Sequence, residues 1–306
     1  MLKILSLTGI IYDDDVVVCG NRIKDMFLDK IENGVIPLSQ KEKYIDAIKE
    51  EWKVFNKINM VTFMLSMSET LCWCRDNGIQ TGPLRGSVGG SRIAYVLDII
   101  DCNPEDYNLV FSRFANEDRV EIGDIDVDVN VDERPMIYKH MFDTFGTRRV
   151  GHVLAIGTVK DKGTIDLIGR GLKNKDGSCV YTLKEIAKIK KEFSENEEKT
   201  KSKYKDLFYY FDGLNNTKVS QSIHPAGIVV SCVDLINSYG AFINKDGLQV
   251  LQIDMEDCHC VGLCKYDFLA LKQVQILEEI SKSTNTPYPK YHTINWTDEN
   301  VWKDLT

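Results

Sequence analysis

The sequence predicts an α+β fold in which helices come first, short strands follow, and a small helical lobe interrupts the strands. From 41 to 77, apolar residues recur at three- and four-residue steps, which is the period of a helix. Between 184 and 210 the chain is rich in Lys and Glu with apolar residues at helical spacing, which indicates exposed helices in a separate lobe. Segments with the character of strands occur at 122–129, 152–158, 226–232 and 262–271.

Two more helices are predicted between these segments. A glycine- and serine-rich stretch at 82–91 breaks the first helical pattern, and a helix is expected to begin on it and run from 92 to 100. Another helix is expected at 134–145. Aromatic residues such as Tyr44 and Trp52 give the first helices their spacing, and core packing is their expected role.

Composition places the chain among proteins with a buried core. Of its 306 residues, 43% are hydrophobic and 27% are charged, which predicts one large or two small domains. No apolar run approaches the roughly 20 residues of a membrane span, and residues 1–9 lack a secretory cleavage pattern. Nine cysteines without a repeated spacing favour reduced thiols. We therefore expect a cytoplasmic protein with no membrane partner.

The net charge and the local charge distribution give opposite indications about nucleic-acid binding. A formal net charge of -8 disfavours a general nucleic-acid binder, because phosphate neutralisation needs clustered Lys and Arg. Cations nevertheless outnumber acids between 148 and 175. This basic stretch contains Arg148, Arg149, Lys160, Lys162, Arg170, Lys173 and Lys175. A nucleic-acid contact and a solvated charged face both fit the pattern.

Three carboxylates, Asp124, Asp126 and Asp128, alternate with Ile and Val. These aliphatic residues favour a strand, whose period of two puts all three acids on one face. Like charges so aligned repel unless they are well solvated or hold a cation, and oxygen ligands at this density suit magnesium. An exposed acidic edge strand that prevents aggregation is the alternative. A calcium loop of the EF-hand type is excluded, since Val129 and Pro135 stand where it requires glycine and glutamate.

Two Gly-Ser pairs, Gly86-Ser87 and Gly90-Ser91, precede a predicted helix. Backbone amides at glycines can approach an anion closely, and hydroxyl groups and the helix N-terminus add donors. The spacing is neither that of a Walker loop nor that of a Rossmann loop. A phosphate site and a plain turn before a helix are both compatible with it.

Cys258, His259, Cys260 and Cys264 form a cluster with some likeness to a zinc site. A Cys-x-Cys pair with another cysteine four residues on lacks the second well-spaced pair of structural zinc sites. We therefore interpret these residues as cysteines of strands.

Ordered motifs extend over roughly residues 41 to 280. They comprise Gly82–Ser91, Asp101–Pro104, Phe111–Phe114, Asp124–Asp128, Gly157–Lys160, His224–Val230 and Leu263–Leu271. In this order they resemble the C-family, bacterial replicative type of DNA polymerase, whose members include the alpha subunit of DNA polymerase III.

The resemblance implies a palm of the polymerase-beta-like nucleotidyltransferase kind, a mixed sheet with flanking helices, into which a small helical thumb is inserted. It divides the chain into an N-terminal helical segment at 1–80, a first part of the palm at 81–168, a thumb-like helical insertion at 169–220, and a second part of the palm at 221–306, cut off before the fingers.

By position, the resemblance also implies the site residues. Asp124, Asp126 and Asp267 would be catalytic and hold two magnesium ions, which activate the primer 3′-hydroxyl and stabilise the leaving pyrophosphate. Asp128 aligns with a third acid that is not expected to bind metal. The residues implied to bind the triphosphate are Gly86, Ser87, Gly90, Ser91, Arg113 and Lys265. Those implied to bind the DNA backbone are Lys160, Lys162 and Arg170.

The resulting hypothesis is the palm and thumb of a DNA-directed DNA polymerase, which transfers a nucleotide from a dNTP to the 3′-hydroxyl of primer–template DNA. Because the family places fingers after the palm whereas this chain stops at Thr306, a split polymerase is expected, with a second polypeptide that supplies the fingers. Its compact size suggests a viral source and a bacterial or infected-host cytoplasm. A catalytically silent DNA-binding or assembly module and a template-independent nucleotidyltransferase are the alternatives.

Overall fold

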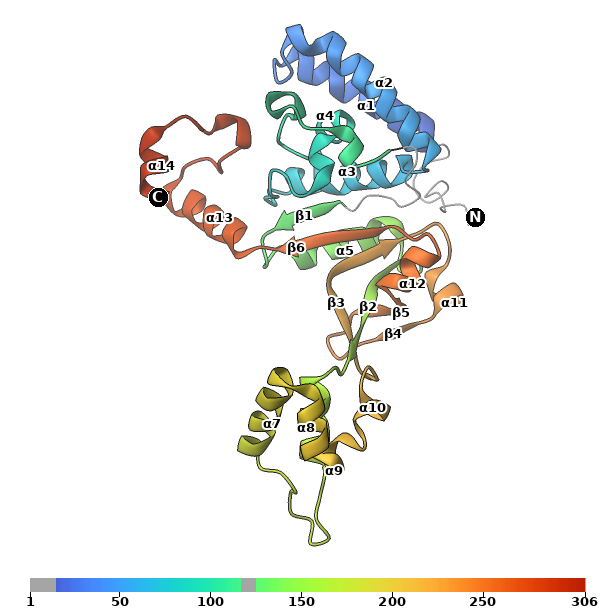
Figure 1. Cartoon of the computed structure of the whole chain (residues 1–306). Coiled ribbons are helices and arrows are strands. Elements are labelled where there is room, and N and C mark those ends of the chain that lie inside the picture. Colours follow the sequence, from blue (N-terminus) through green and yellow to red (C-terminus); the bar gives the residue numbers. More distant parts are fainter. Residues whose placement is uncertain (1–14, 117–124, 306) are drawn as a thin grey trace. The chain divides into compact units, whose positions relative to one another are not determined.

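The computed structural model describes residues 15–116 and 125–305 of the chain (Figure 1). They fall into two compact units. The larger unit runs to Val153 and resumes at His224, and the inserted unit comprises Leu154–Ile223. Among the described helices, none combines the length and the apolar character needed to cross a membrane.

Four helices build the N-terminal part of the larger unit. They are α1 (Asp15–Glu32), α2 (Lys41–Lys57), α3 (Val61–Asp76) and α4 (Arg92–Val96). Tyr44 and Phe55 of α2 are completely buried, as the helical spacing predicts. Helix α4 is shorter than the predicted helix at 92–100, because Asp98 adopts a left-handed backbone with φ 58°, which a helix cannot continue through.

A mixed sheet of six strands, in the order β1-β6-β3-β2-β5-β4, forms the other part of the larger unit. Strand β1 is parallel to β6, whereas β3 and β6 and also β4 and β5 are antiparallel pairs. The strands are β1 (Asp126–Val129), β2 (Val150–Thr158), β3 (Lys218–Val230), β4 (Ala241–Ile243), β5 (Gln249–Asp254) and β6 (Lys265–Ala270). The remaining helices of this unit are α5 (Arg134–Phe145), α11 (Leu235–Tyr239), α12 (Met255–Cys260), α13 (Lys272–Thr284) and α14 (Glu299–Leu305). The predicted α+β class is confirmed.

The apolar face of β6 packs against α3 and α5. The ring of Tyr266 meets that of Phe63 edge-on at 4.8 Å between centroids, and Phe268 meets Tyr138 at 6.1 Å. The Tyr266 hydroxyl also bonds to that of Ser66 at 2.6 Å. Since side chains alternate along a strand, Lys265 and Asp267 face the other side of the sheet.

Strand β3 begins at Lys218, eight residues before the start of the predicted strand at Ala226. The first part of β3, from Lys218 to Gln221, is exposed and contains one apolar residue, Val219, so it carries no apolar pattern by which a strand could be recognised. Its buried part, Ala226–Val230, lies within the predicted strand at 226–232, which extends two residues beyond the observed end.

The inserted unit is helical apart from the ends of β2 and β3. Its helices are α6 (Lys162–Gly171), α7 (Leu183–Glu195), α8 (Glu197–Lys203), α9 (Lys205–Phe208) and α10 (Phe211–Leu214). Its small core contains Ile165, Ile168, Ile189, Leu207, Phe208 and Phe211. The Lys- and Glu-rich faces of α7 and α8 remain exposed, as amphipathic spacing requires.

We expect Thr182→Ala to destabilise α7 by about 1 kcal/mol. Thr182 caps this helix in a capping box, in which its hydroxyl oxygen accepts a hydrogen bond from the backbone N–H of Glu185 at 3.3 Å. Hydrogen exchange of the α7 amides measures the change. Ser194→Ala, on the same helix, is the control, because the Ser194 hydroxyl only donates to a carbonyl within the helix. An equal effect of both variants would contradict the prediction.

Candidate functional site

Asp126 and Asp267 lie side by side on neighbouring parallel strands. Strands β1 and β6 pair in a register that sets Asp126 opposite Asp267, and neighbouring strands are about 4.8 Å apart. Opposed residues point to the same face of a sheet, so both carboxylates lie on the face away from α3 and α5. Asp128 follows on this face two residues along β1. Asp124, the third predicted catalytic carboxylate, lies outside the described residues.

Two cations pair with the three described carboxylates of this acidic face and offset part of their charge. The guanidinium of Arg85 lies 3.0 Å from Oδ1 of Asp128 and 3.8 Å from Oδ2 of Asp126. Lys265, two residues before Asp267 on β6, forms an ion pair with it. Lys265 is a predicted site residue, whereas Arg85 was missed. The signal for Arg85 was its position in the glycine-rich segment, directly before Gly86.

The environment of the carboxylates differs across the face. Burial raises the pKa of Asp128 above its ordinary value, against the lowering effect of Arg85. The side chain of Asp126 is 33% exposed, while that of Asp267 is 9% exposed. Oδ1 of Asp267 is buried without a hydrogen-bond partner among the described residues. A buried carboxylate oxygen in this state is costly, so it marks a position that a bound cation can satisfy.

Two glycines lie beside the acidic face at positions where an added side chain would collide with neighbouring residues. Gly227 of β3 pairs with Asp267, and a Cβ added to it would lie 2.8 Å from Nδ1 of His224 and 2.9 Å from Cδ of Lys265. A Cβ on Gly82 would lie 2.8 Å from that of Asp128. These two glycines therefore leave room for the side chains of the acidic face.

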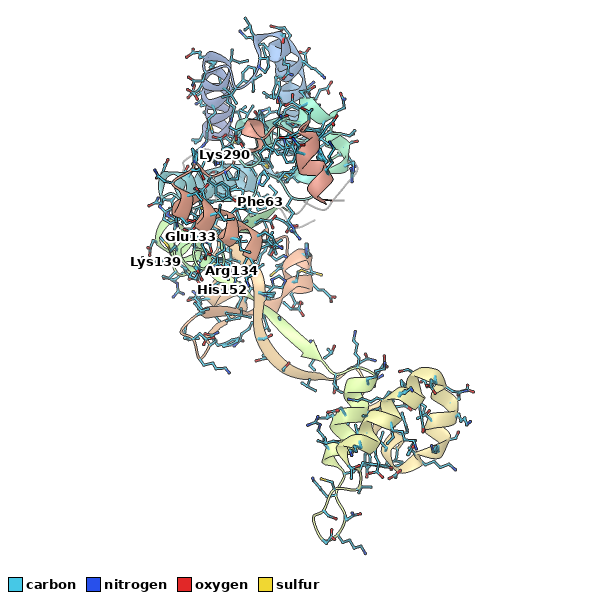
Figure 2. All side chains as sticks on the ribbon, turned by 90° about the vertical axis from the view of Figure 1, so that its left-hand side faces the viewer. Phe63, Glu133, Arg134, Lys139, His152 and Lys290 are labelled. Carbon is cyan, nitrogen blue, oxygen red and sulfur yellow. The ribbon has the colours of Figure 1, made fainter. Side chains whose placement is uncertain are left out.

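Contacts from His224 and from α5 fix the part of β3 next to Asp267. Nδ1 of His224 accepts a hydrogen bond from the Gly227 N–H at 2.8 Å. Arg134 of α5 donates to the Pro225 carbonyl at 2.6 Å. Figure 2 labels Arg134 near the buried His152, whose pKa is lowered to about 4 by burial and by the charge of Arg134. His152 is thus neutral, and neither histidine was predicted as a site residue.

The glycine-rich loop consists of a 3₁₀ turn, η2 (Ser87–Gly90), followed directly by α4. The Ser91 amide is not open to an anion, because this N–H donates to the Val88 carbonyl at 3.0 Å. Ser91 is completely buried, and its hydroxyl donates to Glu51 at 2.7 Å. Gly90 is also buried, and a Cβ on it would lie 2.5 Å from the Val110 carbonyl oxygen.

The accessible part of the loop lies at its beginning. Arg85 and Gly86 are exposed, and Ser87 is half-buried. Gly86 has a φ of 74°, a conformation that glycine adopts without strain. A second 3₁₀ turn, η4 (Phe111–Arg113), packs against η2 and carries the exposed side chain of Arg113. Four of the six predicted triphosphate ligands, Gly86, Ser87, Arg113 and Lys265, therefore lie on or beside the acidic face and the exposed loop, whereas Gly90 and Ser91 belong to the packed interior.

The family model described as the bacterial DNA polymerase III alpha NTPase domain matches residues 21–270. The chain belongs to this family. The resemblance found in the sequence motifs is thereby confirmed.

The similar curated proteins are DNA polymerase III alpha subunits. The subunit of Buchnera aphidicola subsp. Acyrthosiphon pisum (strain APS) is 30% identical over 266 residues, which cover 83% of this chain and 23% of the relative. That of Escherichia coli (strain K12) is 28% identical over 267 residues, or 84% of this chain and 23% of the relative. That of Ureaplasma parvum serovar 3 is 30% identical over a match that covers 86% of this chain and 28% of the relative. The chain thus spans about a quarter of the length of these relatives.

The match to the DNA polymerase III alpha NTPase family also includes the inserted unit, where the predicted DNA-binding cations lie. Lys160, Lys162 and Arg170 are exposed. Lys162, Arg170 and Lys190 line an open groove of about 590 Å³ with Asp166, which accepts hydrogen bonds from both Arg170 and Lys190. The groove is therefore partly neutralised, with an excess of positive charge.

The cysteine cluster of this family member is spread over different environments. Cys258 and Cys260 lie on helix α12, so their assignment to a strand is wrong. Cys258 is buried in a small apolar cluster, Cys260 is exposed, and Cys264 is half-buried just before β6. Within the described ranges, no group of three or more His, Cys, Asp or Glu side chains is arranged to hold a metal ion, and the predicted carboxylate set includes Asp124 from outside them.

Proposed function

We propose that this member of the DNA polymerase III alpha NTPase family is the palm of a DNA-directed DNA polymerase and transfers a nucleotide from a dNTP to a primer 3′-hydroxyl. The observation that carries the proposal is the register of β1 and β6, which pairs Asp126 with Asp267 on one face of the sheet. Two aligned carboxylates, one with a buried oxygen that has no partner among the described residues, are suited to bind divalent cations.

The donor set fits magnesium, which prefers carboxylate oxygens. Asp124, Asp126 and Asp267 are the residues that would hold two ions. When bound, the ions would lower the pKa of the primer hydroxyl and stabilise the charge on the pyrophosphate. Arg85 and Lys265 pair with the carboxylates and are the groups that can turn to phosphate oxygens.

The triphosphate would lie along the exposed start of the glycine loop. Arg85, Gly86 and Ser87 offer a guanidinium, a backbone amide and a hydroxyl there, and Arg113 adds positive charge from η4. An arginine fork matches phosphate geometry in two parallel hydrogen bonds. Gly90 and Ser91 would shape this loop without touching the substrate.

The inserted unit would act as the thumb, with Lys160, Lys162 and Arg170 on the phosphates of primer–template DNA. Contacts of this kind hold the duplex and carry no sequence information. We propose that a second polypeptide with fingers holds the incoming base.

Metal binding tests the proposed site directly. Mn²⁺, a paramagnetic substitute for magnesium, is titrated into the wild-type protein and followed by electron paramagnetic resonance. We expect Asp267→Asn to weaken binding by at least about tenfold, because it removes a buried carboxylate charge. Asp143→Asn, an exposed residue of α5 paired with Lys139, is the control and should bind as the wild type does. Equal binding by wild type and Asp267→Asn would refute the proposed metal site.

A further inference from the structure

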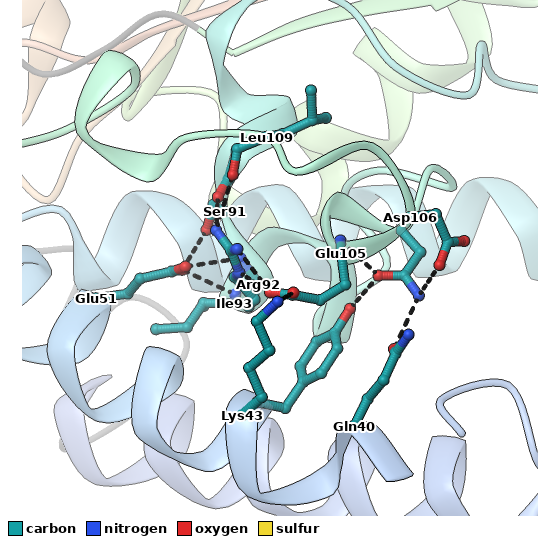
Figure 3. A network of polar contacts seen from close by, with 12 residues as sticks. Gln40, Lys43, Glu51, Ser91, Arg92, Ile93, Glu105, Asp106 and Leu109 are labelled. Carbon is teal, nitrogen blue, oxygen red and sulfur yellow. Dashed lines mark hydrogen bonds and ion pairs between the residues drawn. The ribbon is translucent and has the colours of Figure 1, made fainter. Parts of the chain in front are cut away.

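A buried carboxylate holds the end of the glycine loop. Glu51 of α2 is 2% exposed. It accepts hydrogen bonds from the Ser91 hydroxyl at 2.7 Å, from the Arg92 amide at 2.9 Å and from the Ile93 amide at 3.0 Å (Figure 3). All three donors belong to the junction of the loop with α4. At this junction the carboxylate of Glu51 therefore occupies the position at which a bound anion would be expected.

A second set of contacts ties the same junction to the surrounding chain. Arg92 donates to the Gly90 carbonyl at 2.9 Å and to the Leu109 carbonyl at 3.2 Å. Its guanidinium also pairs with Glu105 of η3 (Pro104–Tyr107) at 2.6 Å, and Glu105 pairs in turn with Lys43 of α2 (Figure 3). Helix α2 thus holds the junction directly through Glu51. It also holds the junction indirectly, because Lys43 of α2 pairs with Glu105, which pairs with Arg92.

We propose that Glu51 is a positioning residue, which fixes the glycine loop from the inside in the conformation that binds the nucleotide. This inference rests on the proposed function of the exposed loop residues. The loop contains Gly86, Gly89 and Gly90. Since the backbone of glycine has more conformational freedom than that of any other residue, the shape of the loop depends on contacts with the surrounding chain. Glu51 makes three such contacts, and none of them is to Arg85, Gly86, Ser87 or Arg113, which are proposed to meet the phosphates.

The protonation state of Glu51 gives this role a measurable signature. Burial raises its pKa to about 7, although the bonds from Ile93, Arg92 and Ser91 and the charge of Arg92 act in the opposite direction. Beyond Arg92, Glu105 and Lys43 are the next charged groups facing this site. The ionised carboxylate accepts from all three donors, whereas the protonated one presents a hydrogen to one of them. The hold on the loop should therefore strengthen as pH rises through about 7.

The contribution of Glu51 to the stability of the folded state should change with pH in the direction opposite to its hold on the loop. The folded pKa of Glu51 is raised above its ordinary value of 4.5. The folded state therefore binds more protons than the unfolded state between these two values. The contribution to folding is complete below pH 4.5 and is lost as pH rises through about 7. A residue that served stability alone would show only this second dependence.

The first measurement is hydrogen exchange of the amides of residues 84–91 in the full chain, corrected for intrinsic rates. At pH 8, Glu51→Gln should accelerate their exchange by about tenfold, because bonds to a charged acceptor are lost. At pH 6 the difference should largely disappear, since the wild-type carboxyl is then protonated as well. Glu278→Gln is the matched control, a carboxylate that is 4% exposed and bonded to Asn130, and it should leave the loop unchanged. Unchanged exchange in Glu51→Gln at pH 8 would overturn the inference.

The second measurement is the affinity for dATP with magnesium at pH 6 and pH 8. Because dATP itself titrates in this range, the ratio of wild-type to Glu51→Gln affinity is the informative quantity. We expect this ratio to rise by about tenfold between the two values. Altered loop exchange with a constant ratio would overturn the positioning role.

Failure of the proposed function would look different. If the wild type binds no dATP at either pH while its loop exchange still depends on Glu51, nucleotide binding is refuted and the hold of Glu51 on the loop stands. If Glu51→Gln does not fold, the pH dependence of loop hydrogen exchange in the wild type alone tests the inference. Loop exchange that slows from pH 6 to pH 8 supports the inference, and exchange independent of pH refutes it.

Discussion

Asp126→Asn is expected to lower primer extension by at least about a thousandfold, which corresponds to about 4 kcal/mol of lost transition-state stabilisation. The substitution keeps the size of the side chain and removes the charge that the proposed metal site needs. Its effect on stability should be small, since the Asp126 side chain is 33% exposed and lies 3.8 Å from the guanidinium of Arg85. Exposed ion pairs of this kind contribute about 0–1 kcal/mol.

The assay uses primer–template DNA with this chain, with a polypeptide that carries fingers, and with the two mixed. We expect the chain alone to extend feebly, because a substrate misplaced by about 1 Å loses roughly a hundredfold in rate. Asp143→Asn serves as the control for an exposed acid. Extension that survives Asp126→Asn in the mixture would show that the catalytic acids lie elsewhere. Extension without template would favour the template-independent nucleotidyltransferase.

Gly90→Ala is expected to destabilise the larger unit by about 3 kcal/mol, the upper end of the usual cost of overpacking. The new Cβ would lie 2.5 Å from the carbonyl oxygen of Val110 and 2.7 Å from its carbonyl carbon, so backbone must move.

Urea unfolding followed by tryptophan fluorescence measures this loss, because Trp52, Trp73, Trp296 and Trp302 all belong to the larger unit. Gly20→Ala on α1 is the matched control. Its Cβ would meet Trp52 at an ordinary 3.7 Å, and replacing glycine within a helix should stabilise it by up to about 1 kcal/mol. A Gly90→Ala protein as stable as Gly20→Ala would contradict the packing role.

Local patterns in the sequence determined the bounds of one helix, the face on which two acids of a strand lie, and the family of the chain. Helix α5 has the predicted bounds, because a continuous helical pattern ends at Gly146, which adopts a φ of 93°. The alternation of Asp with Ile and Val placed Asp126 and Asp128 on one face of β1, because the period of a strand is a property of neighbouring residues. The ordered motifs were sufficient to recognise the polymerase family.

Contacts between distant segments were decided only by the tertiary structure. The register of β1 on β6 sets Asp126 beside Asp267. It depends on the packing of β6 against α3 and α5 and on the apolar core that β1 shares with them, and not on either strand alone. The Gly-Ser pairs looked alike in sequence, yet Ser87 lies near the surface while Ser91 is buried against Glu51. Local sequence restricts backbone conformation, but which side chain a group meets depends on how the whole chain excludes water and satisfies its buried polar atoms.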